Sequence, residues 1–144
     1  MPDDDVPREP EHLVLYDGAC GFCSHVVGWL LDADRHGLFH FAPLQGSSAA
    51  ALRGRHPDLP ADPNSVLYVD RSSGSEQVFA RAQAIFRICD RLDHPPIWLG
   101  LARRLPAWLT DFGYRAVART RHRLSRALAP CPLPSSAARA RFHP

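Results

Sequence analysis

The sequence predicts an α/β fold that begins with a parallel strand–helix–strand unit and continues with a hairpin and a closing helix. Short β-prone runs alternate with segments whose apolar residues recur at helical spacing. Two of these runs are separated by a short turn rich in serine and glycine, which indicates an antiparallel hairpin. The chain has 144 residues, of which 45% are hydrophobic, and this suits one domain with a modest core plus an appendage.

The first strand is predicted over residues 12–17 and the first helix over residues 20–33. Residues 12–16 are apolar and β-prone, and Asp17-Gly18 is typical of a turn. Gly37 suits a cap after the end of the helix. The helix itself is indicated by apolar residues at helical spacing, namely Phe22, Val26, Val27, Trp29, Leu30 and Leu31.

The remaining core elements are expected in the order strand, helix, strand, strand, helix. A parallel strand–helix–strand unit followed by a hairpin and a closing helix is typical of a thioredoxin-like core, here residues 12–94. The predicted elements are a strand over 38–42, a short helix over 49–53 capped by Ser47 or Ser48, strands over 65–70 and 76–80, and a helix over 82–92.

The segments outside this core are expected to differ in order. Residues 95–128 read as a helical extension packed on the core and divided at Pro106 and Gly113. The acidic, proline-bearing residues 1–11 are expected to be disordered, and residues 129–144 to form a loose tail.

The most informative motif is the pair Cys20 and Cys23, where the first strand gives way to the first helix. Two thiols three residues apart on a first helical turn share one face and are close enough to form a disulfide. The N–H groups of that turn and the helix dipole favour a thiolate. The motif predicts thiol–disulfide exchange, with Cys20 as the more exposed, attacking thiol of lowered pKa and Cys23 as the resolving thiol.

Asp17, at the end of the first strand, is the third candidate catalytic residue. As a partly buried carboxylate it would move protons during thiol exchange or orient the loop, whereas as an Asx-type turn residue it would have no chemical role. Both interpretations stay open. Arg81 could meet Asp17 or an anionic substrate, but a solvated helix start is favoured. Tyr114 and Arg121 are expected to dock the extension rather than to take part in chemistry.

A metal site is the main alternative for the cysteine pair. A tetrahedral zinc site needs two more ligands, and Cys89 and Cys131 are the remaining cysteines. Cys89 lies on the apolar stripe of the third helix, and neither belongs to a second Cys-x-x-Cys motif. His25 would share one helix with the pair, which is poor geometry for a tetrahedron. Redox chemistry is therefore favoured, and neither a metal nor a cofactor is predicted.

The charge distribution is uneven, although the net charge is +2. Residues 1–102 carry eight arginines against fourteen acidic residues, whereas residues 103–144 carry nine arginines against Asp111 alone. The basic segment could bind nucleic acid or anionic lipid. A solvated helix face docked on an acidic body is favoured, because no nucleic-acid motif accompanies it. No nucleic-acid partner is predicted.

The chain shows no sign of export. No apolar run approaches the roughly 20 residues that a membrane-spanning helix needs, and residues 1–11 lack the features of a secretory signal. A cytoplasmic location is expected, where structural disulfides are rare. The absence of lysine, with much alanine and proline, suggests a high-GC bacterial genome.

Several motifs of the chain resemble the DCC family of predicted thiol-disulfide oxidoreductases. Its N-terminal motif is similar to Tyr16-Asp17-Gly18 with Cys20 and Cys23, followed by Asp34 and residues 39–45. Residues 78–85 look like its segment before the third helix, and residues 114–121 with 131–134 look like its C-terminal signature. The resemblance covers about residues 13–134. It implies a thioredoxin-like fold and a reaction type, but no substrate.

The sequence as a whole thus predicts a thiol–disulfide oxidoreductase that acts through a mixed disulfide. Its partners would be a disulfide-containing protein or a small thiol substrate and an unknown electron donor. The alternative is a non-catalytic binding module in which the cysteine pair is structural or binds a metal. A zinc measurement and a count of free thiols before and after mild reduction distinguish the two.

Overall fold

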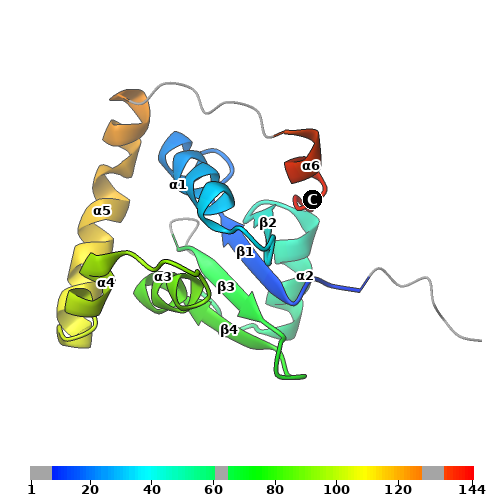
Figure 1. Cartoon of the computed structure of the whole chain (residues 1–144), viewed down its shortest axis with the longest axis horizontal. Coiled ribbons are helices and arrows are strands. Elements are labelled where there is room, and N and C mark those ends of the chain that lie inside the picture. The colour runs from blue at the N-terminus through cyan, green and yellow to red at the C-terminus, as the bar shows by residue number, and fades with distance from the viewer. Residues whose placement is uncertain (1–7, 61–64, 128–134) are drawn as a thin grey trace, which may run out of the picture.

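The computed structural model describes residues 8–60, 65–127 and 135–144. Its centre is a four-stranded mixed sheet in the order β2-β1-β3-β4 (Figure 1). The predicted α/β class is confirmed, and the arrangement is consistent with a thioredoxin-like fold. The strands are β1 (His12–Tyr16), β2 (Phe39–Pro43), β3 (Leu67–Asp70) and β4 (Gln77–Ala80).

The central strand β1 sets the register of the sheet. It pairs in parallel with β2, with Val14 opposite Phe41, and antiparallel with β3, with Val14 opposite Tyr68. The hairpin partner β4 then pairs antiparallel with β3. β1 is an inner strand, with β2 on one side and β3 on the other. The turn after Tyr16 therefore starts at the carboxyl end of an inner strand, which is where α/β proteins commonly have their sites.

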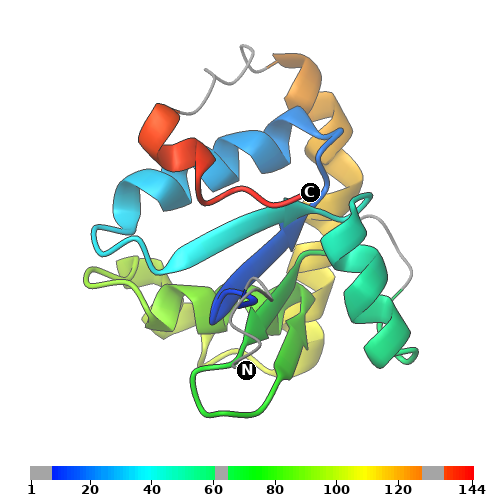
Figure 2. The same ribbon diagram turned by 90° about the vertical axis from the view of Figure 1, so that its right-hand side faces the viewer.

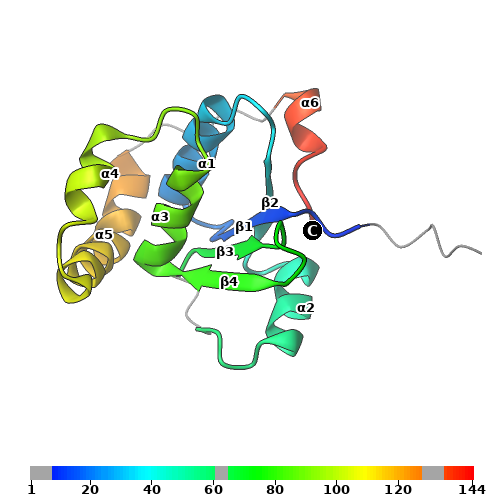
Figure 3. The ribbon, with the colours of Figure 1, turned by 60° about the horizontal axis from the view of Figure 1, so that its bottom comes forward.

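Helices cover both faces of the sheet (Figure 3). Helices α1 (Gly21–Ala33) and α3 (Arg81–Asp90) pack on one face, over a core that includes Val14, Phe41 and Tyr68. Helix α2 (Ser47–Arg55) packs on the other face, over a core that includes Leu15 and Leu67. The alternation of β1 side chains between two apolar cores explains why this strand is buried nearly throughout.

Several element boundaries differ from the predictions by a few residues. Helix α2 begins after Gly46, which makes no side-chain cap, so neither Ser47 nor Ser48 has the predicted capping position. Gly37 lies just beyond α1 with a φ of 64°, and the helix ends at the cap residue Asp34, whose carboxylate accepts the N–H groups of Leu38 and Phe39. This acceptor ties the end of α1 to the start of β2.

The C-terminal extension consists of α4 (Ile97–Ala102) and α5 (Ala107–Ala127). Both lie outside α1 and α3, on the side away from α2 (Figures 1 and 3). The predicted division at Pro106 separates α4 from α5, but the division at Gly113 was wrong, because α5 runs through it unbroken. A glycine within a helix costs only about 1 kcal/mol, which packing against α1 and α3 can offset.

The described part of the expected loose tail, residues 135–144, is ordered against β2 (Figure 2). After the short helix α6 (Ser136–Arg139), the Phe41 N–H donates to the Arg141 carbonyl and the His143 N–H donates to the Phe41 carbonyl. The Arg141 side chain pairs with Asp34. The open edge of β2 offers unpaired backbone groups, so a segment with few apolar residues can still bind there.

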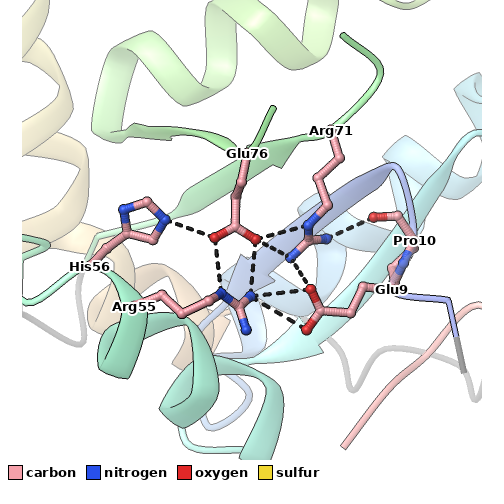
Figure 4. Close-up of polar contacts among 6 residues, drawn as sticks. All are labelled: Glu9, Pro10, Arg55, His56, Arg71 and Glu76. Carbon is pink, nitrogen blue, oxygen red and sulfur yellow. Dashed lines mark hydrogen bonds and ion pairs between the residues drawn. The ribbon is translucent and has the colours of Figure 1, made fainter. Parts of the chain in front are cut away.

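A polar cluster fixes the N-terminal segment (Figure 4). Glu76, next to β4, accepts from Arg55 and Arg71 at 2.7–3.0 Å and contacts His56 Nε2 at 2.7 Å. Arg55 and Arg71 both reach Glu9 as well, and Arg71 donates to the carbonyl of Pro10. Residues 9–11 are therefore held on the body rather than disordered as expected. Residues 1–7 lie outside the described residues.

Candidate active site

The cysteine pair lies where the sequence places it, at the start of α1 just after β1. Cys20 is the residue that precedes the first turn of α1, and its carbonyl accepts the N–H of Ser24 at 3.1 Å. The Cys20 N–H donates to the Asp17 carbonyl at 3.2 Å, which closes the tight turn after β1. Cys23 follows within the first helical turn, so both cysteine side chains lie at the N-terminal end of α1.

The two cysteines are free thiols and approach each other to 3.3 Å. The prediction that Cys20 is the more exposed of the two was wrong. Cys20 is only 2% exposed, whereas Cys23 is half-buried. The cause is α5, whose last turns lie across the start of α1.

Ser125 of α5 packs directly against Cys20. Its Oγ lies 3.5 Å from Cys20 Sγ and accepts the N–H of Phe22 at 3.0 Å. The same hydroxyl donates to the carbonyl of Arg121 at 2.9 Å. One serine therefore satisfies a free N–H at the start of α1 and contacts the thiol beside it.

Arg121, one turn earlier on α5, reaches the other thiol. Its Nη1 lies 3.4 Å from Cys23 Sγ, and its Nη2 lies 3.0 Å from Asp17 Oδ2. Both Arg121 and Asp17 are buried, so this ion pair is shielded from solvent. Arg121 docks α5, as predicted from the sequence, and also places a permanent positive charge beside the thiols.

The environment moves the pKa values of the two thiols in opposite directions. Burial raises the pKa of Cys20, but hydrogen bonds from Ser125 and Cys23, together with the charge of Arg121, hold it below its usual value. Burial and the neighbouring Cys20 raise the pKa of Cys23 to about 11, although Arg121 opposes that rise. Of the two thiols, Cys20 therefore ionises first, while Cys23 keeps its proton.

Asp17 combines features of both interpretations of its role. Its Oδ1 accepts the N–H of Ala19 at 3.1 Å, which is the geometry of an Asx turn. The same oxygen accepts from Gln45 Nε2 at 2.9 Å, and the other oxygen pairs with Arg121. The carboxylate is thus buried and held from three directions, which fixes the loop that carries Cys20.

The other residues considered from the sequence also have contacts elsewhere in the fold. Arg81 has a φ of 58° and lies against Ser65, with its N–H donating to the Val66 carbonyl. The Tyr114 hydroxyl accepts the N–H of Val66, so it joins α5 to the segment before β3. Cys89 is buried in α3, as predicted. Cys131 lies outside the described residues.

The metal alternative for the cysteine pair needs further ligands close to the two thiols, and the structure describes three of the four cysteines. Among the residues it describes, no three histidine, cysteine, aspartate or glutamate side chains converge on one point. His25 shares α1 with Cys23, whereas two other histidines have partners elsewhere: His40 contacts His143, and His56 contacts Glu76. Within the same described residues, no helix is long and apolar enough to cross a membrane.

A cavity of about 880 Å³ opens beside the cluster, between the sheet and helices α1, α3, α4 and α5. Asp17, Cys23, Tyr114 and Arg121 line part of it, and most of the other lining side chains are apolar. Cys23 is therefore the member of the pair that lines this cavity. Cys20 is not part of its wall.

The sequence-based reasoning missed Ser125 entirely and gave Arg121 no chemical role. The available signal was the spacing of Tyr114, Arg121 and Ser125, which are seven and four residues apart and so share one face of a helix. That face would have shown which side chains of α5 meet the core. It would not have shown that they meet the thiols.

The fold and the dithiol at the start of α1 define a protein equipped for thiol chemistry, and comparison with known proteins agrees. The chain belongs to the family of DCC1-like thiol-disulfide oxidoreductases, whose model matches residues 14–127. The predicted family is therefore confirmed.

Two curated relatives are similar over most of the chain. The uncharacterized protein YuxK of Bacillus subtilis (strain 168) is 26% identical over 136 residues, which cover 94% of this chain and 96% of that protein. A DCC family protein of Arabidopsis thaliana, named as chloroplastic, is 28% identical over 111 residues, covering 76% of this chain and 62% of that protein. No solved structure matches the chain.

Proposed function

We propose that this protein is a thiol–disulfide oxidoreductase with a thioredoxin-like fold, and that Cys20 and Cys23 carry the reaction. The observation that carries the proposal is the contact between two free thiols whose pKa values are shifted in opposite directions. A structural pair would gain nothing from such an asymmetry, whereas an exchange reaction needs one thiolate and one thiol. The family membership supports the same reaction type.

In the first step, the Cys20 thiolate attacks one sulfur of a substrate disulfide. The new bond joins Cys20 Sγ to that sulfur, the substrate S–S bond breaks, and the second substrate sulfur leaves as a thiolate that takes up a proton. The hydroxyl of Ser125 and the charge of Arg121 stabilise the attacking form of Cys20. Because Cys20 is 2% exposed, the end of α5 must move aside for a protein disulfide to reach it.

In the second step, Cys23 loses its proton and attacks Cys20 Sγ. The mixed disulfide breaks, the substrate leaves as a thiol, and a Cys20–Cys23 disulfide remains. Arg121, with Nη1 3.4 Å from Cys23 Sγ, stabilises the Cys23 thiolate as it forms. The pKa of Cys23 is raised while Cys20 is a thiolate, and it falls once the charge of Cys20 is removed in the mixed disulfide.

The main role of Asp17 in this scheme is to position other groups of the site. Its carboxylate orients Arg121 and the turn before Cys20, and Gln45 fixes the carboxylate in place. We assign Asp17 a positioning role. A further role would be proton transfer to or from Cys23, and a pH profile of the activity of an Asp17→Asn variant would detect it.

The substrate class is a disulfide-containing protein or a small disulfide, and the electron donor is another dithiol that reduces the Cys20–Cys23 disulfide. No cofactor enters the reaction, because two thiols supply both electrons. A reducing compartment such as the cytoplasm would keep the pair in its dithiol form.

The decisive experiment measures alkylation rate against pH for each thiol alone. Variants Cys23→Ser and Cys20→Ser, each made with Cys89 and Cys131 replaced by serine, report on one cysteine at a time. Cys20 should react faster near neutral pH, and the Cys23→Ser variant should trap a substrate as a stable mixed disulfide. Cys20→Ser should have no disulfide reductase activity.

Two results would overturn the assignment. Faster alkylation of Cys23 would reverse the two roles, and equally slow alkylation of both would argue against catalysis. Stoichiometric zinc bound to the native protein, together with thiols that react only after the metal is removed, would favour the metal-binding alternative.

A further inference from the structure

The outward face of α5 carries a row of side chains that the redox site does not use. Trp108 and Phe112 are followed by Arg115, Arg119, Arg123 and Arg126, at spacings of three and four residues. Such spacings place all six on one side of a helix. All six are exposed, with Trp108 at 71% and Phe112 at 65%, and α5 is about 30 Å long.

The arginines of this row are not used to dock the helix. Arg121 and Arg103 are the ones that reach acidic groups of the core, Asp17 and Asp90. Among the described residues, no acidic side chain forms an ion pair with any of the four arginines of the row. These four arginines therefore lie on an exposed face of α5, which agrees with the solvated helix face expected from the sequence, while Arg121 docks the helix on the body.

The apolar end of the row continues onto α4. Ile97 is 97% exposed and Leu101 is 69% exposed, and the two are one helical turn apart. Helix α4 lies beside the first half of α5 in both views (Figures 1 and 3). Large apolar side chains that are exposed together on neighbouring helices indicate a surface that binds a membrane or another molecule.

The charge of the whole chain is divided between this region and the rest. Residues 95–127 carry seven arginines and one acidic residue, Asp111, whereas residues 1–94 carry eight arginines and fourteen acidic residues. In the part of the chain that the structure describes, the residues outside 95–127 carry ten arginines and ten acidic residues, so the excess of positive charge lies on the side of α4 and α5. A planar anionic surface would attract that side and so orient the protein.

We propose that α4 and α5 form a docking surface for an anionic phospholipid membrane, with the protein lying on the membrane and not spanning it. The arginines of the row would bind phosphate groups of the lipids, and Trp108, Phe112, Ile97 and Leu101 would enter the interface beside them. A helix with aromatic and aliphatic groups beside a basic face is typical of interfacial binding.

A lipid surface fits these groups better than the other anionic partners. A nucleic acid could bind the arginines and stack on the two aromatic rings, but it offers no partner for Ile97 and Leu101. The arginines also follow one face of a single helix about 30 Å long, which suits a flat surface of headgroups. This inference is independent of the proposed redox reaction.

Cosedimentation of the full chain with vesicles tests the proposal. The probes are vesicles of phosphatidylcholine alone and of phosphatidylcholine mixed with phosphatidylglycerol. The protein should bind the anionic vesicles and not the neutral ones, and added salt should weaken the binding. The double variant Arg119→Gln with Arg123→Gln should lower the partition coefficient on the order of 20-fold. Trp108→Ser with Phe112→Ser should lower it on the order of 10-fold or more.

The matched control is Arg8→Gln with Arg35→Gln, which removes the same charge from exposed arginines away from α5. It should change the partition coefficient less than twofold, and circular dichroism should show that all variants are folded. An equal loss in the control would show that net charge alone drives binding and would overturn the proposal. Failure to bind anionic vesicles would also overturn it, as would tighter binding to a DNA duplex than to vesicles.

Discussion

Arg121 Nη2 lies 3.0 Å from Asp17 Oδ2, although the two residues are 104 positions apart in the chain. Both are buried, and the same guanidinium reaches Cys23 Sγ at 3.4 Å. The contact therefore joins the last long helix to the loop that carries the cysteine pair. Packing of α5 and the electrostatics of the thiols depend on one ion pair.

Replacing Arg121 with glutamine should destabilise the protein by about 3 kcal/mol or more, because it leaves the buried carboxylate of Asp17 without its charged partner. It should also slow alkylation of Cys23, since Arg121 opposes the rise of the Cys23 pKa. Urea unfolding measures the first effect. The exposed control Arg35→Gln should change the free energy of unfolding by less than about 0.5 kcal/mol, and an equal effect of both variants would contradict the prediction.

Much of the fold follows from local patterns in the sequence. The strand before Asp17, the helix after Cys20 and the apolar stripe of α3 each come from periodicity within about a dozen residues. The docking of residues 135–144 on β2 could not be predicted in this way. It depends on backbone groups of Phe41 and on the Arg141–Asp34 pair, and neither leaves a periodic pattern.

Within the site, the sequence predicted only the residues that are close to one another in the chain. The spacing of Cys20 and Cys23 places both thiols on one helical turn without any tertiary information. Their relative burial depends instead on Ser125 and Arg121, which come from α5 some hundred residues later. The pKa of Cys20 is lowered, but the side chains of Ser125 and Arg121 that help to lower it and cover the thiol come from packing between helices, which local patterns do not encode.

Glu76 should make the stability of the protein fall at acid pH. Burial raises its pKa, but hydrogen bonds from Arg55, His56 and Arg71 outweigh this and lower it to about 2, from an ordinary value of 4.5. As the pH falls from about 4.5 towards 2, the unfolded chain takes up a proton at this residue that the folded protein does not. The stabilisation is complete above that window and is lost within it.

A Glu76→Gln variant tests this linkage by urea unfolding at several pH values. It should be less stable than the parent protein near neutral pH, and the difference should shrink as the pH falls through the window. A difference that stays constant with pH would show that the carboxylate does not contribute through its charge. Asp93→Asn, which affects only the exposed pair with His36, is the control.

Phe142 should contribute to the docking of the C-terminal segment. Its ring lies 5.4 Å from the ring of Phe41, centroid to centroid, and its backbone forms a bridge with that residue. Phe142→Ala should lower the free energy of unfolding by about 1–3 kcal/mol, because it removes a half-buried aromatic contact. Hydrogen exchange at the Phe41 and His143 amides should become faster. Unchanged exchange would show that the backbone bonds alone hold the segment.

The hydroxyl of Ser125 has one proton and two acceptors within reach. It donates to the Arg121 carbonyl, and Cys20 Sγ lies 3.5 Å away. While Cys20 is a thiol, its own proton can point to Ser125 Oγ. Once Cys20 is a thiolate, the serine proton stabilises it only by turning from the carbonyl to the sulfur. Ser125 is therefore a positioning residue whose effect depends on the ionisation of Cys20.

Ser125→Ala should accordingly raise the pKa of Cys20 and slow its alkylation at neutral pH by about 2- to 10-fold, since a hydrogen bond contributes about 0.5–1.5 kcal/mol. At a pH well above the pKa of Cys20, the rates of variant and parent should converge, because the thiolate is then fully formed in both. Thr120→Ala is the matched control: its hydroxyl also bonds to α5 carbonyls but lies on the exposed side of that helix. A rate reduced equally at every pH would mean that Ser125 limits access to Cys20 and does not set its pKa.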